Sequence, residues 1–382
     1  MAEPVESRHV SSNAEIVSTL TIGHNHRTPV ILGQINSDTI VAHGPGVPAG
    51  RAVIFIDRWV WHRYGDILLS IFQVAYSTVK IVKVSPGEPS KSWNSLGRLL
   101  STMTDLHIDR RSDALYAIGG GVILDVVGLA ASIYKRGVAL AKIPTTLMGQ
   151  IDAGLGLKNA INYDGVKNSV GSFAAPHSVF VDFAFLQSLP FRHVANGVSE
   201  IIKFGLVLDP GIIADLVVLS PEDLARPESQ FLIVIKKSIC GMVDELSRNP
   251  YEMILQRSLD FGHWLSPQLE LLDPDLLHGE AVSIDMALSL TVSLQRGMLH
   301  CRDWHAALGL LNAWGLPLTH EQVNETLVNA SLERTIRHRG GSQNIPLCSG
   351  IGKYEIANDV CIEEVLRAQN LIQESFYHRN LV

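Results

Sequence analysis

A change in hydrophobic periodicity near Pro190 is the feature that most constrains the fold of this 382-residue chain. Before it, short β-branched apolar runs alternate with segments of helical spacing. After it, long apolar periodicities dominate. Alternating strands and helices predict a parallel sheet covered by helices, whereas repeated helical periodicity predicts packed helices. We therefore expect an α/β domain over residues 1–190 and an all-α domain over residues 191–382.

Apolar spacing and turn residues give the individual elements. The expected strands are Ala52–Asp57, Val79–Val84, Ala114–Ile118 and Ala139–Ile143. The expected helices are Tyr64–Tyr76, Ser92–Leu106, Val122–Tyr134, Val194–Val207, Gln230–Leu246, Glu280–Arg296 and Arg302–Trp314. Residues 1–13 are expected to form a mobile tail. The active site is expected in the cleft between the domains, beyond the carboxyl ends of the strands.

Charge and composition exclude several classes of protein. A formal net charge of −7 argues against general nucleic-acid binding, which needs a basic surface. No apolar stretch approaches the roughly 20 residues that cross a bilayer, and the first residues do not resemble a signal peptide. The four cysteines lie far apart and form no CxxC pair, so thiols in a reducing cytoplasm are expected. A cytoplasmic enzyme is therefore the default interpretation.

Three consecutive glycines follow the strand that ends at Ile118 and precede a helix. In this position Gly119, Gly120 and Gly121 let the backbone approach a diphosphate, which the amides at the helix start can bind. A tight structural turn explains the same cluster about as well. Asp57 ends another apolar strand, where a carboxylate can accept bonds from a ribose. Glu88 and Lys91 follow a later turn and could flank an adenosine, although each alone is typical of a solvated surface charge.

Three candidate metal ligands stand in the second half of the chain: Glu200, His263 and His278. One carboxylate and two imidazoles can hold zinc or a similar ion while leaving coordination positions open for substrate oxygens. Any single histidine is more often a capping or core residue. Glu280 is an alternative, as a residue supporting the site or as the ligand itself.

Cationic residues gather between the two halves and predict a phosphate site. Lys203 lies three residues after Glu200 and so shares its helix face. Lysine and arginine in a largely apolar cleft favour a phosphate, although a solvated loop explains Lys167 alone. The other members of the candidate cluster are Arg136, Asp152, Lys158 and Asn168. His338 and Arg339 could add a phosphate contact from the C-terminal segment, and a solvated basic turn is equally consistent.

These segments together resemble the sugar phosphate cyclases, the superfamily that contains dehydroquinate synthase. The resemblance runs from about residue 57 to residue 352 and is carried by GGGVILDVVG, KIPTTLMGQIDAG, LKNAINYDGVKNSVGSF, VSEIIKFG, LDFGHWLSP and LLHGEAVSIDMA. It implies a Rossmann-like parallel sheet followed by a helical domain, with NAD and Zn²⁺ or Co²⁺ as cofactors. It also implies a homodimer acting on a small sugar phosphate, without nucleic acid or membrane as partner.

The resemblance assigns roles residue by residue. The implied metal ligands are Glu200, His263 and His278. The implied NAD contacts are Asp57, Glu88, Lys91, Gly119, Gly120, Gly121, Asp125, Thr145, Thr146, Phe185 and Ser188. The implied substrate and catalytic residues are Arg136, Asp152, Lys158, Lys167, Asn168 and Lys203.

Departures from the dehydroquinate synthase pattern indicate a different substrate. Asp260 stands where that enzyme has Asn, and Pro267 replaces a second His. Gln256 appears at the position of an Arg that clasps the substrate carboxylate, with Arg257 next to it. A carboxylate without a bidentate partner is poorly held, which favours an uncharged carbon chain bearing one phosphate. Asp260 and Pro267 are expected to alter how an opened intermediate sits.

DFGHxxSPxLE and LLHGEAVxIDMA are similar to the sedoheptulose 7-phosphate cyclases, and among these to the 2-epi-5-epi-valiolone synthases. That similarity implies transient oxidation by NAD, phosphate elimination, reduction and intramolecular aldol closure. Ser169 and Trp264 depart from this group and are expected to reshape the pocket.

Several alternatives remain at this point. Within the cyclases they are a 2-epi-valiolone, a desmethyl-4-deoxygadusol and a 3-dehydroquinate synthase. From other classes they are a metal- and NAD-dependent alcohol or glycerol dehydrogenase and a non-catalytic relative. The dehydrogenase predicts net NADH production and needs no lysine-rich cradle, and the non-catalytic relative predicts lost ligands.

Overall fold

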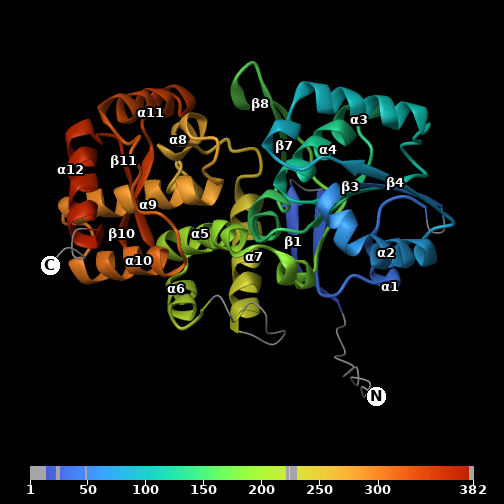
Figure 1. The fold of residues 1–382 in the computed structure, drawn as a ribbon, viewed down its shortest axis with the longest axis horizontal. Helices are drawn as coiled ribbons and strands as arrows, with labels where there is room; N and C mark the ends of the chain where they lie inside the picture. The colour runs from blue at the N-terminus through green and yellow to red at the C-terminus, as the bar shows by residue number, and fades with distance from the viewer. Residues whose placement is uncertain (1–13, 23–25, 48–49, 221–222, 224–229, 378–382) are drawn as a thin grey trace.

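The computed structural model describes residues 14–22, 26–47, 50–220, 223 and 230–377. The tail expected at residues 1–13 lies outside them. Figure 1 shows a region of strands and covering helices on the right and a region of helices on the left. The α/β and helical halves expected from the periodicity are therefore confirmed.

A seven-stranded sheet forms the core of the first region, in the order β1-β2-β9-β6-β5-β3-β4. Its strands are β1 (Glu15–Ile22), β2 (His26–Leu32), β9 (Ser178–Val181), β6 (Leu140–Pro144), β5 (Ala114–Gly119), β3 (Arg51–Asp57) and β4 (Thr78–Val84). All neighbours pair in parallel except β1 with β2. The central strands are continuous apolar runs because helices cover both faces.

The two faces of the sheet are covered by different helices. These are α1 (Ser37–His43), α2 (Arg58–Ala75), α3 (Trp93–Asp105) and α4 (Gly121–Ile133). Val53 and Phe55 of β3 pack with α3 and α4, whereas Ile54 and Ile56 pack with α1 and α2. Alternate side chains of one strand point to opposite faces, so β3 contributes to both layers.

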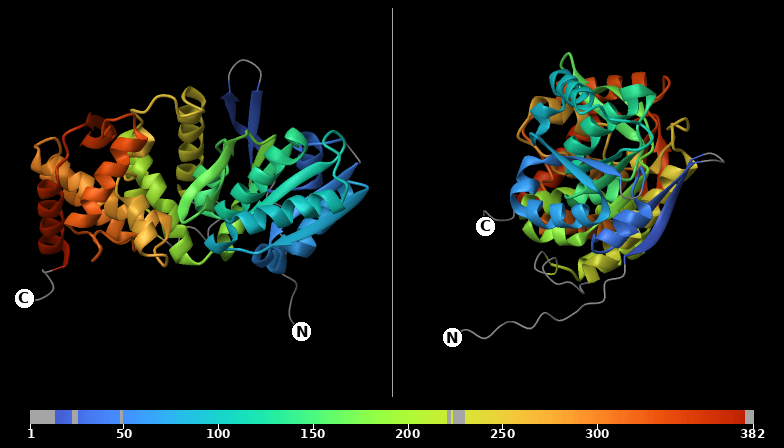
Figure 2. Two further views of the ribbon diagram at one scale, coloured as in Figure 1. Left: turned by 90° about the horizontal axis from the view of Figure 1, so that it is seen from above. Right: turned by 90° about the vertical axis from the view of Figure 1, so that its right-hand side faces the viewer.

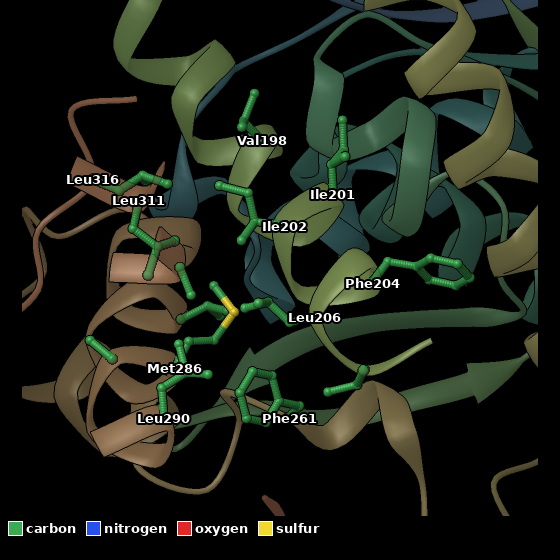
Figure 3. Packing of buried hydrophobic residues seen from close by; sticks show 14 of the residues in the cluster. Val198, Ile201, Ile202, Phe204, Leu206, Phe261, Met286, Leu290, Leu311 and Leu316 are labelled. Carbon is green, nitrogen blue, oxygen red and sulfur yellow. The ribbon is translucent and has the colours of Figure 1, made fainter. Parts of the chain in front are cut away.

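The second region is built around one helix that is buried along nearly its whole length, α9. The helices are α5 (Phe191–Val207), α6 (Pro210–Val217), α7 (Gln230–Arg248), α8 (Ser266–Leu272), α9 (His278–Gln295), α10 (Cys301–Ala313), α11 (Glu325–His338) and α12 (Ile362–Ile372). Every residue of α9 from Gly279 to Ser293 is buried. Figure 3 shows Met286 and Leu290 of α9 facing Ile202 and Leu206 of α5.

Two hairpins were not predicted from the sequence. β10 (Ile345–Gly350) pairs with β11 (Lys353–Ala357) inside the helical region, where Ile345 and Leu347 are buried. β7 (Lys158–Tyr163) pairs with β8 (Val166–Phe173), and this hairpin carries Lys158, Lys167 and Asn168 of the expected cationic cluster. Both contain glycine or asparagine within short runs, so their pairing depends on the surfaces they pack against more than on local pattern.

The two regions share apolar packing. The largest cluster of buried residues runs from Leu20 and Val179 of the sheet to α5, α7 and α9. Figure 2 shows α7 lying beside the β1–β2 hairpin, and Thr21 N donates to Ser247 Oγ of α7 at 3.1 Å. The domain division at residue 190 stays a prediction. Among the described residues no helix is both long and apolar enough to cross a membrane.

Candidate active site

The glycine turn connects the carboxyl end of β5 to the start of α4, as predicted. β5 ends at Gly119 and α4 begins at Gly121, with Gly120 as the cap. A side chain at Gly119 would place its Cβ 2.8 Å from Ile123 and 3.2 Å from Asp57 Cβ. Only glycine therefore allows this close approach of helix and strand ends. The N-terminal amides of α4 face the sheet edge at which a diphosphate can bind.

Three charged groups lie beside the first turns of α4. Lys91 and Asp125 form an ion pair with 2.5 Å between Nζ and Oδ2, and both side chains are largely buried. The Nζ of Lys142 on β6 is buried without a hydrogen-bond partner among the described residues. Burial lowers the pKa of Lys142 to about 8, and the charge of Asp125 opposes this shift. Lys91 is thus part of a buried cluster next to the glycine turn.

Asp57 and Glu88 have local structural partners. Asp57 caps α2, because its carboxylate accepts a 2.7 Å hydrogen bond from Trp59 N. Burial raises the pKa of Asp57 above its usual value. Glu88 is exposed and accepts a 2.7 Å hydrogen bond from Asn162 Nδ2 of β7. Their contacts with a ribose or adenosine stay predictions.

The remaining predicted cofactor residues fall into two places. Thr145 and Thr146 follow β6 beside the glycine turn, and Thr145 N donates to Gly119 O at 3.0 Å. Phe185 and Ser188 instead contact Tyr64 of α2: the rings of Phe185 and Tyr64 meet edge to face, and the Tyr64 hydroxyl bonds Ser188 Oγ at 2.7 Å. The structure places only the threonines against the glycines.

Glu200, His263 and His278 converge in the helical region. Glu200 lies in α5, His263 lies in the turn before α8, and His278 is the first residue of α9. Their ligand atoms lie within 4.8 Å of one another. Each imidazole Nε2 is 3.7 Å from Glu200 Oε1. These separations are too long for hydrogen bonds and suit atoms arranged around a cation.

The hydrogen bonds of the imidazoles orient them for metal binding. His263 Nδ1 bonds Phe261 O at 3.0 Å, and His278 Nδ1 bonds Glu270 Oε1 at 3.0 Å. Because both partners are acceptors, Nδ1 carries the proton in each neutral ring and the Nε2 lone pair faces Glu200. Among the described residues Oε1 of Glu200 is buried without a hydrogen-bond partner, and Oε2 has only the ion pair with Lys203. The donor set therefore fits zinc or a similar ion.

The charged groups of this cluster shift one another's pKa values. Burial and the neighbouring Lys203 lower the pKa of His263 to about 3. For His278 burial acts in the same direction, but the Glu270 and Glu200 carboxylates outweigh it and raise the pKa to about 10, so a metal at Nε2 would displace a proton from this ring. Burial alone would raise the pKa of Glu200, yet Lys203 and the two histidines hold it well below its usual value. A carboxylate that stays ionised here is suited to a cation.

Glu280, the alternative ligand, lies outside this cluster. It forms a bidentate ion pair with Arg192, at 2.6 Å and 2.7 Å, and accepts a hydrogen bond from Leu277 N. Its carboxylate thus caps α9 and is already satisfied. The structure therefore favours Glu200 as the carboxylate of the metal cluster.

Two predicted catalytic residues lie next to Glu200. Lys203 is 3% exposed and forms an ion pair with the fully buried Glu200, one helical turn away on α5. Asp152 lies in the π-helical turn at Gly149–Ala153. Burial, together with the charge of Glu200, raises its pKa, although Lys203 and Lys158 oppose the shift. The structure brings both residues to the metal cluster.

A chain of alternating charges borders the site. Lys158 pairs with Glu252, Glu252 with Arg257, and Arg257 with Asp260. Asp260 also lies 3.4 Å from Arg339, whose guanidinium donates to two backbone carbonyls. Arg339 is buried and does not form a solvated turn. The guanidinium of Arg257 is shared by two carboxylates, which leaves it poorly available to a third.

Lys167 reaches the site through Glu270. Its Nζ lies 3.2 Å from Glu270 Oε2, and Glu270 also bonds His278. Sequence reasoning missed Glu252 and Glu270. Glu270 lies in the SPQLE segment that carried the resemblance, whereas Glu252 had no local signal and has a positive φ of 54°.

Four predicted residues lie outside the bonded cluster. Arg136 is exposed beyond the C-terminal end of α4, and His338 is exposed at the end of α11. Asn168 is exposed in β8, where its backbone N donates to Asn162 Oδ1 at 2.9 Å. Pro267 lies in the first turn of α8. No hydrogen bond or ion pair within the described ranges joins their side chains to the metal cluster.

Trp264 and Ser169, which were expected to reshape the pocket, make structural contacts of their own. Trp264 is 1% exposed and packs in the helical core, where its indole donates to Ser289 Oγ at 3.0 Å. Ser169 donates to the carbonyls of Tyr163 and Val166 and closes the turn of the β7–β8 hairpin. Trp264 therefore anchors the turn that carries His263 to the helical core.

Fold and site together define an enzyme of the dehydroquinate synthase-like class, with a glycine turn for a nucleotide in one region and a cation cluster in the other. Family models agree: that of the 3-dehydroquinate synthase N-terminal region matches residues 81–196, and that of the C-terminal region matches residues 197–335. The chain belongs to the 3-dehydroquinate synthase family, within the sugar phosphate cyclases.

Two relatives within the family are both 2-epi-5-epi-valiolone synthases. A 2-epi-5-epi-valiolone synthase of Streptomyces albus is 36% identical over 346 residues, covering 88% of this chain and 84% of the relative. The structure of ValA, a 2-epi-5-epi-valiolone synthase from Streptomyces hygroscopicus subsp. jinggangensis 5008 with NAD⁺ and Zn²⁺ bound, is 33% identical, with a TM-score of 0.84 over 93% of this chain and 99% of that chain.

A third relative shares the fold. 2-Deoxy-scyllo-inosose synthase, solved with carbaglucose-6-phosphate, NAD⁺ and Co²⁺, is 23% identical with a TM-score of 0.79, covering 94% of this chain and 99% of that chain.

Proposed function

We propose that this enzyme is a sedoheptulose 7-phosphate cyclase that forms 2-epi-5-epi-valiolone, acting as a carbon–oxygen lyase on a phosphate. Similarity over most of the chain to enzymes named for that product supports the proposal. The observation that carries it is the pairing of Arg257 with both Glu252 and Asp260. A guanidinium already held by two carboxylates suits an uncharged polyol better than a substrate carboxylate.

The proposal includes NAD and a divalent metal as cofactors. Glu200, His263 and His278 would hold the metal, and the glycine turn with Lys91 and Asp125 would hold NAD. When bound, NAD supplies reversible hydride acceptance and the metal supplies Lewis acidity toward substrate oxygens. A cytoplasmic homodimer is part of the proposal, on the family resemblance and the four unpaired cysteines.

The side chains of the protein would bind and orient the sugar. Lys203, buried beside Glu200, places a positive charge where an oxyanion can develop. Asp152, whose pKa is raised by burial, holds a proton more readily than an exposed aspartate. Lys158 and Lys167 would bind hydroxyl and phosphate oxygens after partial release from Glu252 and Glu270.

The test is to incubate zinc-loaded protein with NAD and sedoheptulose 7-phosphate. We expect release of inorganic phosphate without net NADH and a carbocyclic product identified by NMR. Turnover only with the carboxylated seven-carbon substrate of dehydroquinate synthase would overturn the substrate assignment. Net accumulation of NADH would indicate a dehydrogenase instead. Glu200→Gln is the control, because it keeps the shape of the site and removes the charge that would hold the metal.

A further inference from the structure

One carboxylate, Glu270 of α8, contacts two groups that the proposed reaction needs. Its Oε1 lies 3.0 Å from His278 Nδ1, and its Oε2 lies 3.2 Å from Lys167 Nζ. The side chain of Glu270 is 12% exposed. The half-buried guanidinium of Arg334 in α11 is also attracted by this carboxylate. Each oxygen of Glu270 therefore has its own hydrogen-bond donor in a nearly water-free position.

These two donors come from different regions of the fold. His278 begins α9 in the helical region, whereas Lys167 lies in β8 of the hairpin that the chain forms between β6 and β9 of the sheet. The hairpin packs on α4 of the sheet region, where Ser172 Oγ and Ser132 Oγ are 2.7 Å apart. In Figure 1 the hairpin stands at the boundary between the two regions. The Lys167–Glu270 pair thus crosses that boundary.

We propose that Glu270 is a positioning residue that couples the β7–β8 hairpin to the metal site. One oxygen fixes the ring of His278 so that Nε2 faces Glu200, and the other anchors Lys167 over the site. This inference rests on the proposed metal site. It goes beyond the proposed reaction by linking metal occupancy to the placement of a substrate-binding lysine. Such linkage is reciprocal, so an ordered hairpin also favours metal binding.

Glutamine at this position weakens both contacts of the carboxylate. An amide carries no charge and has one acceptor oxygen and one NH₂ donor, so when its oxygen accepts from one of His278 and Lys167, its NH₂ group faces the other, and neither contact is charge-assisted. Loss of an outer hydrogen bond to a ligating histidine weakens metal binding about 10- to 100-fold. We therefore expect Glu270→Gln to raise the zinc Kd by about that factor and to free the hairpin. Lys167→Met removes only the hairpin contact and should change the zinc Kd much less.

The experiment measures zinc affinity by competition with a chelating dye, and hydrogen exchange of the amides of residues 163–168 with and without zinc. It compares wild type, Glu270→Gln, Lys167→Met and the double variant. Hairpin exchange should rise to the same extent in all three variants. In the wild type, zinc should slow it, and this effect should be lost in Glu270→Gln. Glu333→Gln, an exposed change on α11, is the matched control for charge.

The outcomes separate this inference from the proposed function. A wild type that binds no zinc at this site would remove the metal centre itself. A wild type that binds zinc, with Glu270→Gln within threefold of its Kd and with unchanged hairpin exchange, would overturn the coupling alone. If Glu270→Gln does not fold, Glu270→Asp replaces it. The charge is kept and the side chain is one methylene shorter, so loss of the Lys167 contact should again loosen the hairpin, and loss of the His278 contact should raise the zinc Kd.

Discussion

Replacement of Lys203 by methionine should destabilise the metal-free protein far more than the zinc-loaded protein. Lys203 and Glu200 are 3% and 0% exposed, so their ion pair has almost no access to water. Removal of one partner of such a pair typically costs about 3–5 kcal/mol, because the other charge stays buried and uncompensated. The His278 side chain, whose pKa is raised, offsets part of the Glu200 charge, so the loss should lie at the lower end of that range. With zinc present, the cation compensates Glu200. The remaining loss should then be about 1 kcal/mol, the usual contribution of one hydrogen bond.

Urea unfolding of both proteins, in chelator and in excess zinc, measures the difference. The stabilisation by zinc should be larger in Lys203→Met than in the wild type, which by linkage means tighter zinc binding. Turnover should fall sharply in the same variant, because the charge beside the substrate is lost. Lys237→Met is the control, since its pair with Asp215 is exposed and should be worth about 0–1 kcal/mol. Equal losses with and without zinc would refute this account of the site.

The other predictions concern the cofactor, the core and pH. Lys91→Met should raise the NAD Kd about tenfold or more, because Asp125 is left without its charged partner. Calorimetry measures the Kd, and an unchanged value would remove Lys91 from the cofactor site. Trp264→Phe should lower the free energy of unfolding in urea by about 1–3 kcal/mol, because Ser289 loses its hydrogen-bond donor. KM should change little. A large change in KM at unaltered stability would place the indole in the substrate pocket. Burial raises the pKa of Asp285 from 3.8 to about 6, so its contribution is present below pH 4 and is lost as pH rises through 6. That contribution is about 3 kcal/mol and should be missing from the pH–stability curve of Asp285→Asn, whereas parallel curves would contradict the shift.

The sequence pattern predicted those strands and turns whose conformation depends on neighbouring residues in the chain. Short apolar runs predicted β3 and β5, and the glycines between β5 and α4 predicted the turn at the sheet edge. The carboxylate and two imidazoles predicted as ligands come together although 78 positions separate the first and last of them, Glu200 and His278. Motif resemblance, more than spacing, made that prediction.

Roles that depend on long-range contacts could not be predicted from the sequence. Glu252 and Glu270 are paired with lysines far away in the chain, Lys158 and Lys167, and no local pattern marks such partners. Trp264 was expected to reshape the pocket, but its side chain is buried in the helical core, where it donates to Ser289. The hairpin β10–β11 forms because the apolar surface of α9 covers a short strand that would not persist alone.

The candidate ligand Glu200 sits mid-helix in the most deeply packed part of the molecule, whereas Lys167 is presented by a two-stranded arm. The two parts of the candidate site therefore differ in how easily they deform. The buried helix that would hold the metal is rigid, whereas the two-stranded arm that would bind the phosphate is flexible. An engineer seeking to accept sugars of other lengths would do best to diversify the arm and leave the buried helix untouched.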